Sequence, residues 1–181
     1  MGRKKIGSVK NDLLFEKARQ VRYLLLDVDG VLTNGQLTFD EAGRELKSFS
    51  IYDGLGINLL HKAGIGVGII SGRRSEIVTH RAGELQIQDI FQGIQDKRGP
   101  YEEIKIKRQL EDRALAFIGD DLIDLPLLQK VGLAVVVANA VEAVKVAADW
   151  VTERKGGEGA VREVIDFILE SQKHDEKNKM V

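Results

Sequence analysis

Short apolar runs alternate with segments of helical spacing along this 181-residue chain. The runs occupy residues 23–28, 65–70, 115–118, 133–137 and 150–152. Runs this short, and apolar almost throughout, are typical of strands that are buried on both faces. Strands that alternate with helices require crossover connections and therefore a parallel sheet. We expect an α/β fold in three layers, with a Rossmann-like parallel sheet between two layers of helices.

The segments between the runs carry apolar residues on one helical face. Their spacing predicts helices near residues 55–63, 77–85, 104–110, 125–131 and 141–147, and a last helix over about 160–171. Residues 1–20 are interpreted as a polar arm followed by a short amphipathic helix. Residues 21–171 are expected to form one domain, and the polar residues 172–181 are expected to be a disordered tail.

One stretch interrupts the alternation just after the first predicted strand. Residues 36–50 place Leu37, Phe39, Leu46 and Phe49 around a Glu-Ala-Gly turn. Apolar residues on both sides of a tight turn predict a β-hairpin. A capping domain needs a much longer insertion, so we interpret this hairpin as a small flap.

The composition excludes several classes of function. Lys and Arg number 27 against 28 Asp and Glu, a net charge of −1, which argues against a nucleic-acid or anionic-membrane binder. The absence of cysteine excludes disulfides and thiolate chemistry and suits a reducing cytoplasm. No apolar run approaches the roughly 20 residues that span a bilayer. We therefore expect a cytoplasmic protein whose partner is a small molecule.

Acidic residues follow two of the predicted strands. Asp27 and Asp29 stand two positions apart at the end of the first run, so their side chains leave on the same side. Three more follow the run at 115–118: Asp120, Asp121 and Asp124. Ligands of open parallel sheets bind beyond the carboxyl ends of the strands, so we expect these carboxylates to meet there. An Asp-Gly turn and a helix cap at Asp124 are the structural alternatives.

Polar residues follow at two further helix starts. Ser71 and Gly72 come directly after the run at 65–70 and would offer a hydroxyl and backbone N–H groups to an anion. The alternative for Ser71 is a plain helix N-cap. Lys97 precedes another predicted helix. It is either a counter-charge for a phosphate and the acidic residues or a solvated surface lysine.

Together these residues predict phosphoryl-transfer chemistry. Hard oxygen ligands without His or Cys favour Mg²⁺. A carboxylate, a divalent cation, a hydroxyl and an ammonium around one point are typical of a phosphoryl-transfer site. In this hypothesis Asp27 attacks the phosphate, and the aspartyl-phosphate is hydrolysed in a second step. Asp29 gives a proton to the leaving oxygen and then activates water.

In their order and position the motifs resemble those of the haloacid-dehalogenase-like (HAD) phosphohydrolases. The matching segments are DVDGVLT at 27–33, Ser71-Gly72, Lys97 and GDDLID at 119–124. The missing cap indicates the capless branch. The longer segments DVDGVLTNG, DGLG at 53–56, SGRRSEIV and GGEGAVRE at 156–163 are similar to phosphatases of 3-deoxy-D-manno-octulosonate 8-phosphate (KDO 8-phosphate).

The resemblance implies an activity, a cofactor and an assembly. The expected reaction is hydrolysis of KDO 8-phosphate to KDO and inorganic phosphate, a step toward lipopolysaccharide biosynthesis. Mg²⁺ is the expected cofactor. The expected assembly is a homotetramer in which a neighbour's flap helps to close the active site.

The resemblance also implies a role for each matching residue. Asp27 corresponds to the nucleophile and a metal ligand, Asp29 to the acid/base that binds the metal through its carbonyl, and Asp120 to the third ligand. Lys97 completes the catalytic set, and Asp121 and Asp124 support it. The implied phosphate and substrate contacts are Asp29, Gly30, Ser71, Gly72, Arg73, Arg81 and Lys97, together with Ser50, Ile51, Tyr52, Asp53, Gly54 and Asn58.

Some positions depart from the pattern of the family. Asn34 stands where some members carry Asp, and Tyr52, Asn58 and Glu158 stand where some carry basic residues. Such cations would bind a sugar-acid carboxylate, so the departures concern the identity of the sugar acid. The arginines that remain for that carboxylate are Arg73, Arg74, Arg81 and Arg162.

Two alternative functions follow from the same residues. One is a phosphatase of a nine-carbon sialic-type acid phosphate. The other is a receiver-like signalling module that is phosphorylated on aspartate. A receiver places its acid pair after the first strand, whereas the pair at 120–121 comes late in this chain.

Overall fold

A parallel sheet organises the computed structural model, which describes the backbone of residues 6–179 and the side chains of residues 12–173. Within that part of the chain the sheet has six strands in the order β5-β4-β1-β6-β7-β8. Neighbouring strands pair in parallel throughout. Their bounds are β1 (Tyr23–Leu26), β4 (Gly66–Ile70), β5 (Asp89–Phe91), β6 (Leu115–Gly119), β7 (Leu133–Val136) and β8 (Trp150–Val151). Residues 1–5 of the expected arm lie outside the described residues.

The register of the three central strands positions the site. All four residues of β1 are buried, as expected for a strand covered on both faces. Leu26 at its end lies beside Ile69 of β4 and Ile118 of β6. The chain therefore leaves these three strands at the same edge of the sheet, and the polar residues that follow them start close together.

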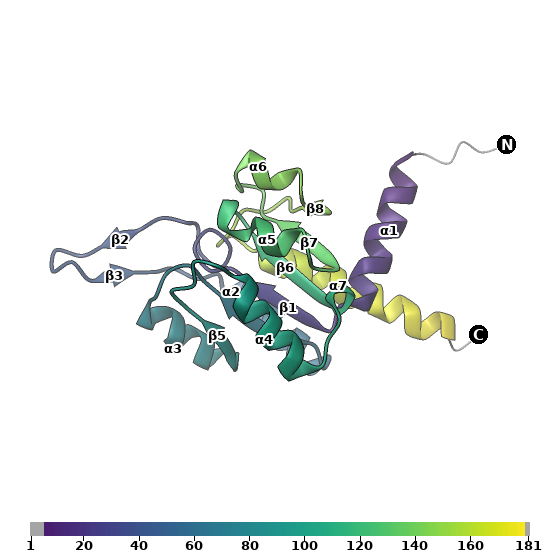
Figure 1. The fold of residues 1–181 in the computed structure, drawn as a ribbon, viewed down its shortest axis with the longest axis horizontal. Helices are drawn as coiled ribbons and strands as arrows, with labels where there is room; N and C mark the ends of the chain where they lie inside the picture. The colour runs from purple at the N-terminus through teal and green to yellow at the C-terminus, as the bar shows by residue number, and fades with distance from the viewer. Residues whose placement is uncertain (1–5, 180–181) are drawn as a thin grey trace.

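Helices cover both faces of the sheet and complete three layers. Their bounds are α1 (Ile6–Gln20), α2 (Ile51–Lys62), α3 (Glu76–Glu84), α4 (Arg98–Arg108), α5 (Leu125–Leu128), α6 (Glu142–Lys145) and α7 (Ala160–Lys179), with 3₁₀ turns at Asp112–Ala114 and Leu122–Asp124. Helix α7 packs against α1 and α2, and α4 packs against α5. Figure 1 shows α4 and α5 in front of the sheet and α7 behind it. The expected α/β fold is confirmed.

The predicted hairpin is present and projects away from the sheet (Figure 1). Strands β2 (Thr38–Phe39) and β3 (Glu45–Leu46) pair antiparallel. The Asp40 carboxylate stabilises the turn because it accepts the N–H groups of Ala42 and Arg44. The flap is therefore a two-stranded arm that leaves the domain after β1 and returns to it at α2.

One continuous apolar core lies between the sheet and its helices. Side chains from β1, β4, β6 and β7 meet apolar faces of α2 and α7, which include Ile57, Leu60, Val164 and Ile168. In the described part of the chain, none of the helices combines the length and the apolar character needed to cross a bilayer.

Helix bounds shift by several residues from the expected ranges, and two segments differ in kind. Strand β5 was not predicted, because it is short and begins with Asp89, whose buried charge is balanced by Lys107 and Arg108. Helix α7 extends to Lys179 and so enters the segment 172–181 for which disorder was expected. That segment contains no Gly or Pro, and its polar residues are compatible with a helix, so low hydrophobicity alone did not define its conformation.

Candidate active site

Asp27 is the first residue after β1 and remains attached to the sheet. Its backbone N–H donates to the Ile118 carbonyl at 3.0 Å. The side chain is only 6% exposed, so its carboxylate lies at the bottom of any site formed at this edge. Burial raises the pKa of Asp27 to about 6, although the neighbouring ammonium of Lys97 opposes the shift.

Lys97 is a buried residue of the site and is not solvated. Its Nζ atom donates to Oδ1 of Asp27 at 2.7 Å and to Oδ1 of Asp124 at 2.6 Å. Burial disfavours the charged ammonium, but its two carboxylate partners outweigh burial and raise the pKa of Lys97. A buried ammonium between two carboxylates fixes all three side chains, because a buried charge that lost its partner would be strongly destabilised.

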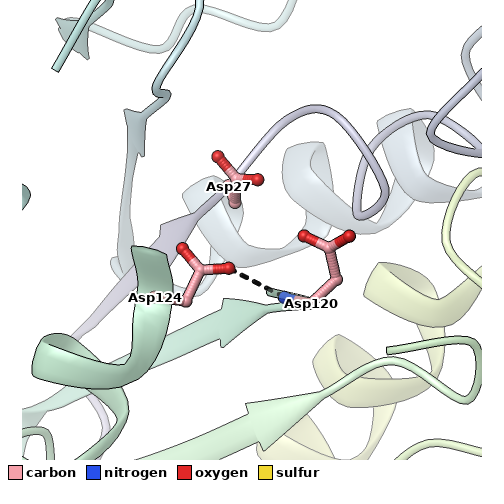
Figure 2. Close-up of side chains that lie close together, drawn as sticks. All are labelled: Asp27, Asp120 and Asp124. Carbon is pink, nitrogen blue, oxygen red and sulfur yellow. Dashed lines mark hydrogen bonds between the residues drawn. The ribbon is translucent and has the colours of Figure 1, made fainter. Parts of the chain in front are cut away.

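Asp124 connects this ion pair to the loop after β6. Its Oδ2 atom accepts the backbone N–H groups of Asp120 at 2.8 Å and Asp121 at 3.2 Å. Figure 2 shows the first of these bonds and the Asp120 side chain beside those of Asp27 and Asp124. Asp124 stands at the N-cap position of α5 but makes no side-chain cap there. Its carboxylate instead holds Lys97 and the backbone that carries Asp120.

The three aspartates form a cluster that fits a divalent cation. Oxygen atoms of Asp27, Asp120 and Asp124 all lie within 4.8 Å of one another. Burial and the charges of Asp27, Asp124 and Asp121 raise the pKa of Asp120 to about 8. No described residue forms a hydrogen bond to the Asp120 carboxylate. A cation would relieve this repulsion, and an all-oxygen donor set is what Mg²⁺ and similar hard ions prefer.

The backbone of Gly30 lies close against the Asp120 side chain. Gly30 has a φ of 97°, and a Cβ there would come within 2.0 Å of Oδ2 of Asp120. The loop at 30–34 is covered in turn by Gly156, where a Cβ would lie 1.7 Å from the Gly30 carbonyl oxygen. The glycine-rich segment before α7 therefore supports the loop that carries Asp29.

A cleft of about 340 Å³ opens above the aspartates. Ser71 lies in its wall, buried, with an Oγ atom that accepts the Arg73 N–H at 3.3 Å. The lining brings together eight residues, of which seven were candidates from the sequence: Asp27, Asp29, Ser71, Gly72, Arg73, Asp120, Asp121 and Ile123. The Ser71 hydroxyl and the Arg73 guanidinium therefore lie in a cleft whose floor is acidic.

The flap contributes residues to the site that the sequence did not indicate. Lys47 forms an ion pair with Oδ1 of Asp29, and its side chain is 2% exposed. Glu45 accepts a bond from Nη2 of Arg73 at 2.7 Å and one from the Ser75 hydroxyl at 2.8 Å. A single lysine or glutamate in a polar hairpin gives no sequence signal, because its partners lie in other elements.

Several predicted substrate contacts do not line the cleft of this chain. Ile51 and Tyr52 are exposed at the start of α2, and Ser50 caps that helix. Asp53 is buried, and its Oδ1 atom accepts the backbone N–H of Arg162 at 2.8 Å. The others lie on or beside α2: Gly54 and Asn58 on the helix, and Arg81 against Gly54 and Phe49.

Comparisons with known proteins agree with this fold and site. A family model for haloacid dehalogenase-like hydrolases matches residues 84–165. A relative from Yersinia pestis, the 3-deoxy-D-manno-octulosonate 8-phosphate phosphatase KdsC, is 43% identical over 166 residues, 92% of this chain and 88% of the relative. The chain belongs to the haloacid dehalogenase-like hydrolase family. The alternative of a receiver-like module is therefore set aside.

Solved structures show which members of the family this chain is similar to. The crystal structure of the Yersinia pestis phosphatase has a TM-score of 0.88, with 43% identity over 90% of this chain and 88% of that chain. A Moraxella catarrhalis 3-deoxy-D-manno-octulosonate 8-phosphate phosphatase, in complex with magnesium, phosphate and KDO, has a TM-score of 0.86, with 38% identity over 92% and 96%. The expected enzyme class, a phosphatase of the HAD family similar to these enzymes, is confirmed.

Proposed function

We propose that this chain hydrolyses KDO 8-phosphate to KDO and inorganic phosphate with Mg²⁺ as its cofactor. The observation that carries the proposal is the buried pair of Asp27 and Lys97 beside Asp120, at the floor of a cleft lined by Ser71 and Arg73. The similarity to phosphatases of this substrate, one of them crystallised with magnesium, phosphate and KDO, supports the same choice.

The side chains of Asp27 and Asp120 and the carbonyl of Asp29 would hold the cation, with Asp121 and Asp124 in support. Asp124 is a less suitable ligand, because both of its oxygens already accept hydrogen bonds. The bound ion would neutralise the negative charge of the aspartates and the phosphate. Ser71, Gly72, Gly30 and Arg73 would contact the phosphate oxygens, as such donors do in other anion sites.

The reaction would proceed in two displacements at phosphorus. An Asp27 oxygen forms a bond to phosphorus while the bond to the sugar oxygen breaks, and that oxygen takes the electron pair and a proton from Asp29. Water then attacks the phosphorus of the aspartyl-phosphate and gives its proton to Asp29. The bond to the Asp27 oxygen breaks, which restores the carboxylate and releases inorganic phosphate. Lys97 balances the charge on Asp27 through both steps.

We also propose a homotetramer in which a neighbour's flap completes the substrate site. Large apolar side chains are exposed on the flap and the start of α2: Leu37, Phe39, Leu46, Ile51, Tyr52 and Leu55. Exposed apolar side chains gathered on one part of a surface are typical of an interface. The expected contacts that are at least partly exposed on or beside α2 would reach the substrate of a neighbouring chain in that assembly: Ser50, Ile51, Tyr52, Asn58 and Arg81.

A panel of phosphate esters tests the proposed substrate. The purified chain with Mg²⁺ is assayed on KDO 8-phosphate, a nine-carbon sialic-type acid 9-phosphate and a hexose phosphate. We expect the highest kcat/KM for KDO 8-phosphate and no turnover after chelation of the metal. A higher value for the nine-carbon acid would support the alternative substrate, and a higher value for the hexose phosphate would contradict a sugar-acid phosphatase.

A further inference from the structure

Lys47 is a flap residue whose buried side chain contacts Asp29, one of the residues that line the catalytic cleft. It follows β3 on a hairpin whose other large side chains, such as Phe39 and Leu46, are about half exposed. The Lys47 side chain is 2% exposed, and its Nζ atom contacts the carboxylates of Asp29 and Glu45. A buried ammonium is stable only with such partners. The flap is therefore attached to the site through a specific charged contact.

Four side chains form a closed ring of alternating charge, and two of them, Asp29 and Arg73, line the cleft. Lys47 joins Asp29 to Glu45, and Arg73 joins Glu45 back to Asp29, with Nη1 of Arg73 3.7 Å from Oδ2 of Asp29. The Ser75 hydroxyl also binds Glu45, which anchors the ring to the start of α3. The ring thus connects the flap, the loop after β1 and the loop after β4.

The orientation of the Asp29 carboxylate depends on this ring. Lys47 faces one oxygen of Asp29 and Arg73 faces the other. Among the described residues, Lys47 alone donates a hydrogen bond to that carboxylate, and Arg73 adds an ion pair at a longer distance. Lys97 does not orient Asp29, because its ammonium donates to Asp27 and Asp124 instead. Asp29 therefore differs from Asp27, which the sheet and a buried lysine hold in place.

We infer that Lys47 is a positioning residue for the hydrolysis, which orients Asp29 for proton transfer, and that Glu45 holds Lys47 and Arg73 in register. This inference rests on the proposed phosphatase function. It makes the flap part of the proton-transfer machinery of its own subunit, in addition to any contact with a neighbour. A carboxylate misdirected by a fraction of an ångström transfers a proton less efficiently to the leaving oxygen.

The choice of leaving group distinguishes positioning from a structural role. A sugar alkoxide needs a proton as it leaves, whereas p-nitrophenolate leaves readily without one. We expect Lys47→Met to lower kcat/KM by about tenfold or more for the sugar phosphate and by about threefold or less for p-nitrophenyl phosphate. Lys47→Arg should recover part of the loss. The Mg²⁺ concentration for half-maximal activity should not change.

Arg44→Met is the matched control, because Arg44 is an exposed cation of the same hairpin whose partner is Asp40 in the turn. It should leave both substrates within about twofold of wild type. Glu45→Gln serves as a second variant if Lys47→Met does not fold, and should show the same dependence on leaving group. Equal losses on both substrates, or a Lys47→Met enzyme as active as Arg44→Met, would overturn this inference but leave the proposed phosphatase function standing. A wild-type chain inactive on both substrates would overturn the proposed function and the inference with it.

Discussion

Lys97 donates to Asp27 and Asp124 with none of its side chain exposed. Removing one partner of a buried charged pair typically costs about 3–5 kcal/mol, because the other charge is left unpaired. The three side chains are therefore restrained before any substrate arrives. Asp120 is the opposite case, since burial and repulsion by its acidic neighbours raise its pKa to about 8. At the residue scale, the site combines a fixed carboxylate, which is the proposed nucleophile, with an acidic position that a cation would stabilise.

Asp27→Asn tests the nucleophile assignment. The amide has the shape of the carboxylate and can still accept a bond from Lys97, so the fold should persist. It cannot attack phosphorus, so kcat should fall by a factor on the order of 1000 or more. Steady-state kinetics with Mg²⁺, together with a thermal melt of the same sample, measure both effects. A folded variant that retains activity would refute the assignment.

The aspartates and Ser71 could be predicted from the sequence because strand ends of a parallel sheet meet at one edge. The burial of Lys97 could not be predicted, since its two partners, Asp27 and Asp124, come from the loops after β1 and β6. Lys47 was missed for the same reason. Asp53 was expected to contact substrate, but its carboxylate instead reaches the first turn of α7. A residue in a shared motif can thus support the fold of a site without lining it.

At the scale of elements, the strongly patterned segments were the most predictable. The apolar runs at 23–28 and 115–118 became β1 and β6, and the hairpin formed where its turn residues indicated. Helix α4 begins at Arg98, six residues before its predicted range. Only Tyr101 and Ile104 of this helix are buried, so its first turns carry little apolar periodicity. Strand β5 depends on pairing with β4, which local sequence does not encode.

Asp53 connects two helices and carries a prediction about pH. It lies in the first turn of α2 and accepts the Arg162 N–H at the start of α7, while its Oδ2 atom has no hydrogen-bond partner in the described residues. Burial raises the pKa of Asp53 to about 6, against the effect of the backbone hydrogen bonds from Arg162 and Gly159. The folded state therefore binds the proton more tightly than the unfolded chain. This contribution to stability is lost as the pH rises from about 4 through about 6.

Asp53→Asn removes that charge and keeps an oxygen that can accept the Arg162 N–H. The free energy of unfolding of the variant, relative to wild type, should rise by about 1–2 kcal/mol between pH 5 and pH 7.5. Urea denaturation of both proteins at the two pH values measures it. A difference that does not change with pH, or that falls, would show that Asp53 is already ionised at low pH in the folded state.

At the scale of the whole molecule, the cleft is open to solvent, and no cap domain covers it within residues 6–179. The flap projects from one end of the sheet (Figure 1) and exposes Leu37 and Phe39. Burying such side chains would stabilise an assembly by about 25 cal/mol for each Å² of apolar surface removed from water. This is the physical reason to expect that copies of the chain associate through their flaps.

Light scattering after size exclusion tests the assembly. The wild-type chain should elute with about four times the 20.1 kDa mass of one chain. Phe39→Ser should lower the mass and raise KM, because a neighbour's flap would no longer complete the site. Leu13→Ser changes an exposed apolar residue of α1 and should leave the mass unchanged. A wild-type monomer with full activity would contradict the proposed tetramer.

The proposed chemistry requires a divalent ion that joins Asp27 to Asp120 and allows Asp27 to accept a phosphoryl group. A crystal structure of the wild-type chain with Mg²⁺ and beryllium fluoride, which mimics a phosphoryl group on aspartate, would show whether both groups bind there. We expect the fluoride complex on an Asp27 oxygen, within reach of Lys97 and Ser71, and one Mg²⁺ ion held by Asp27, Asp120 and the Asp29 carbonyl. Density for the complex on another residue, or Mg²⁺ bound away from Asp27 and Asp120, would contradict it.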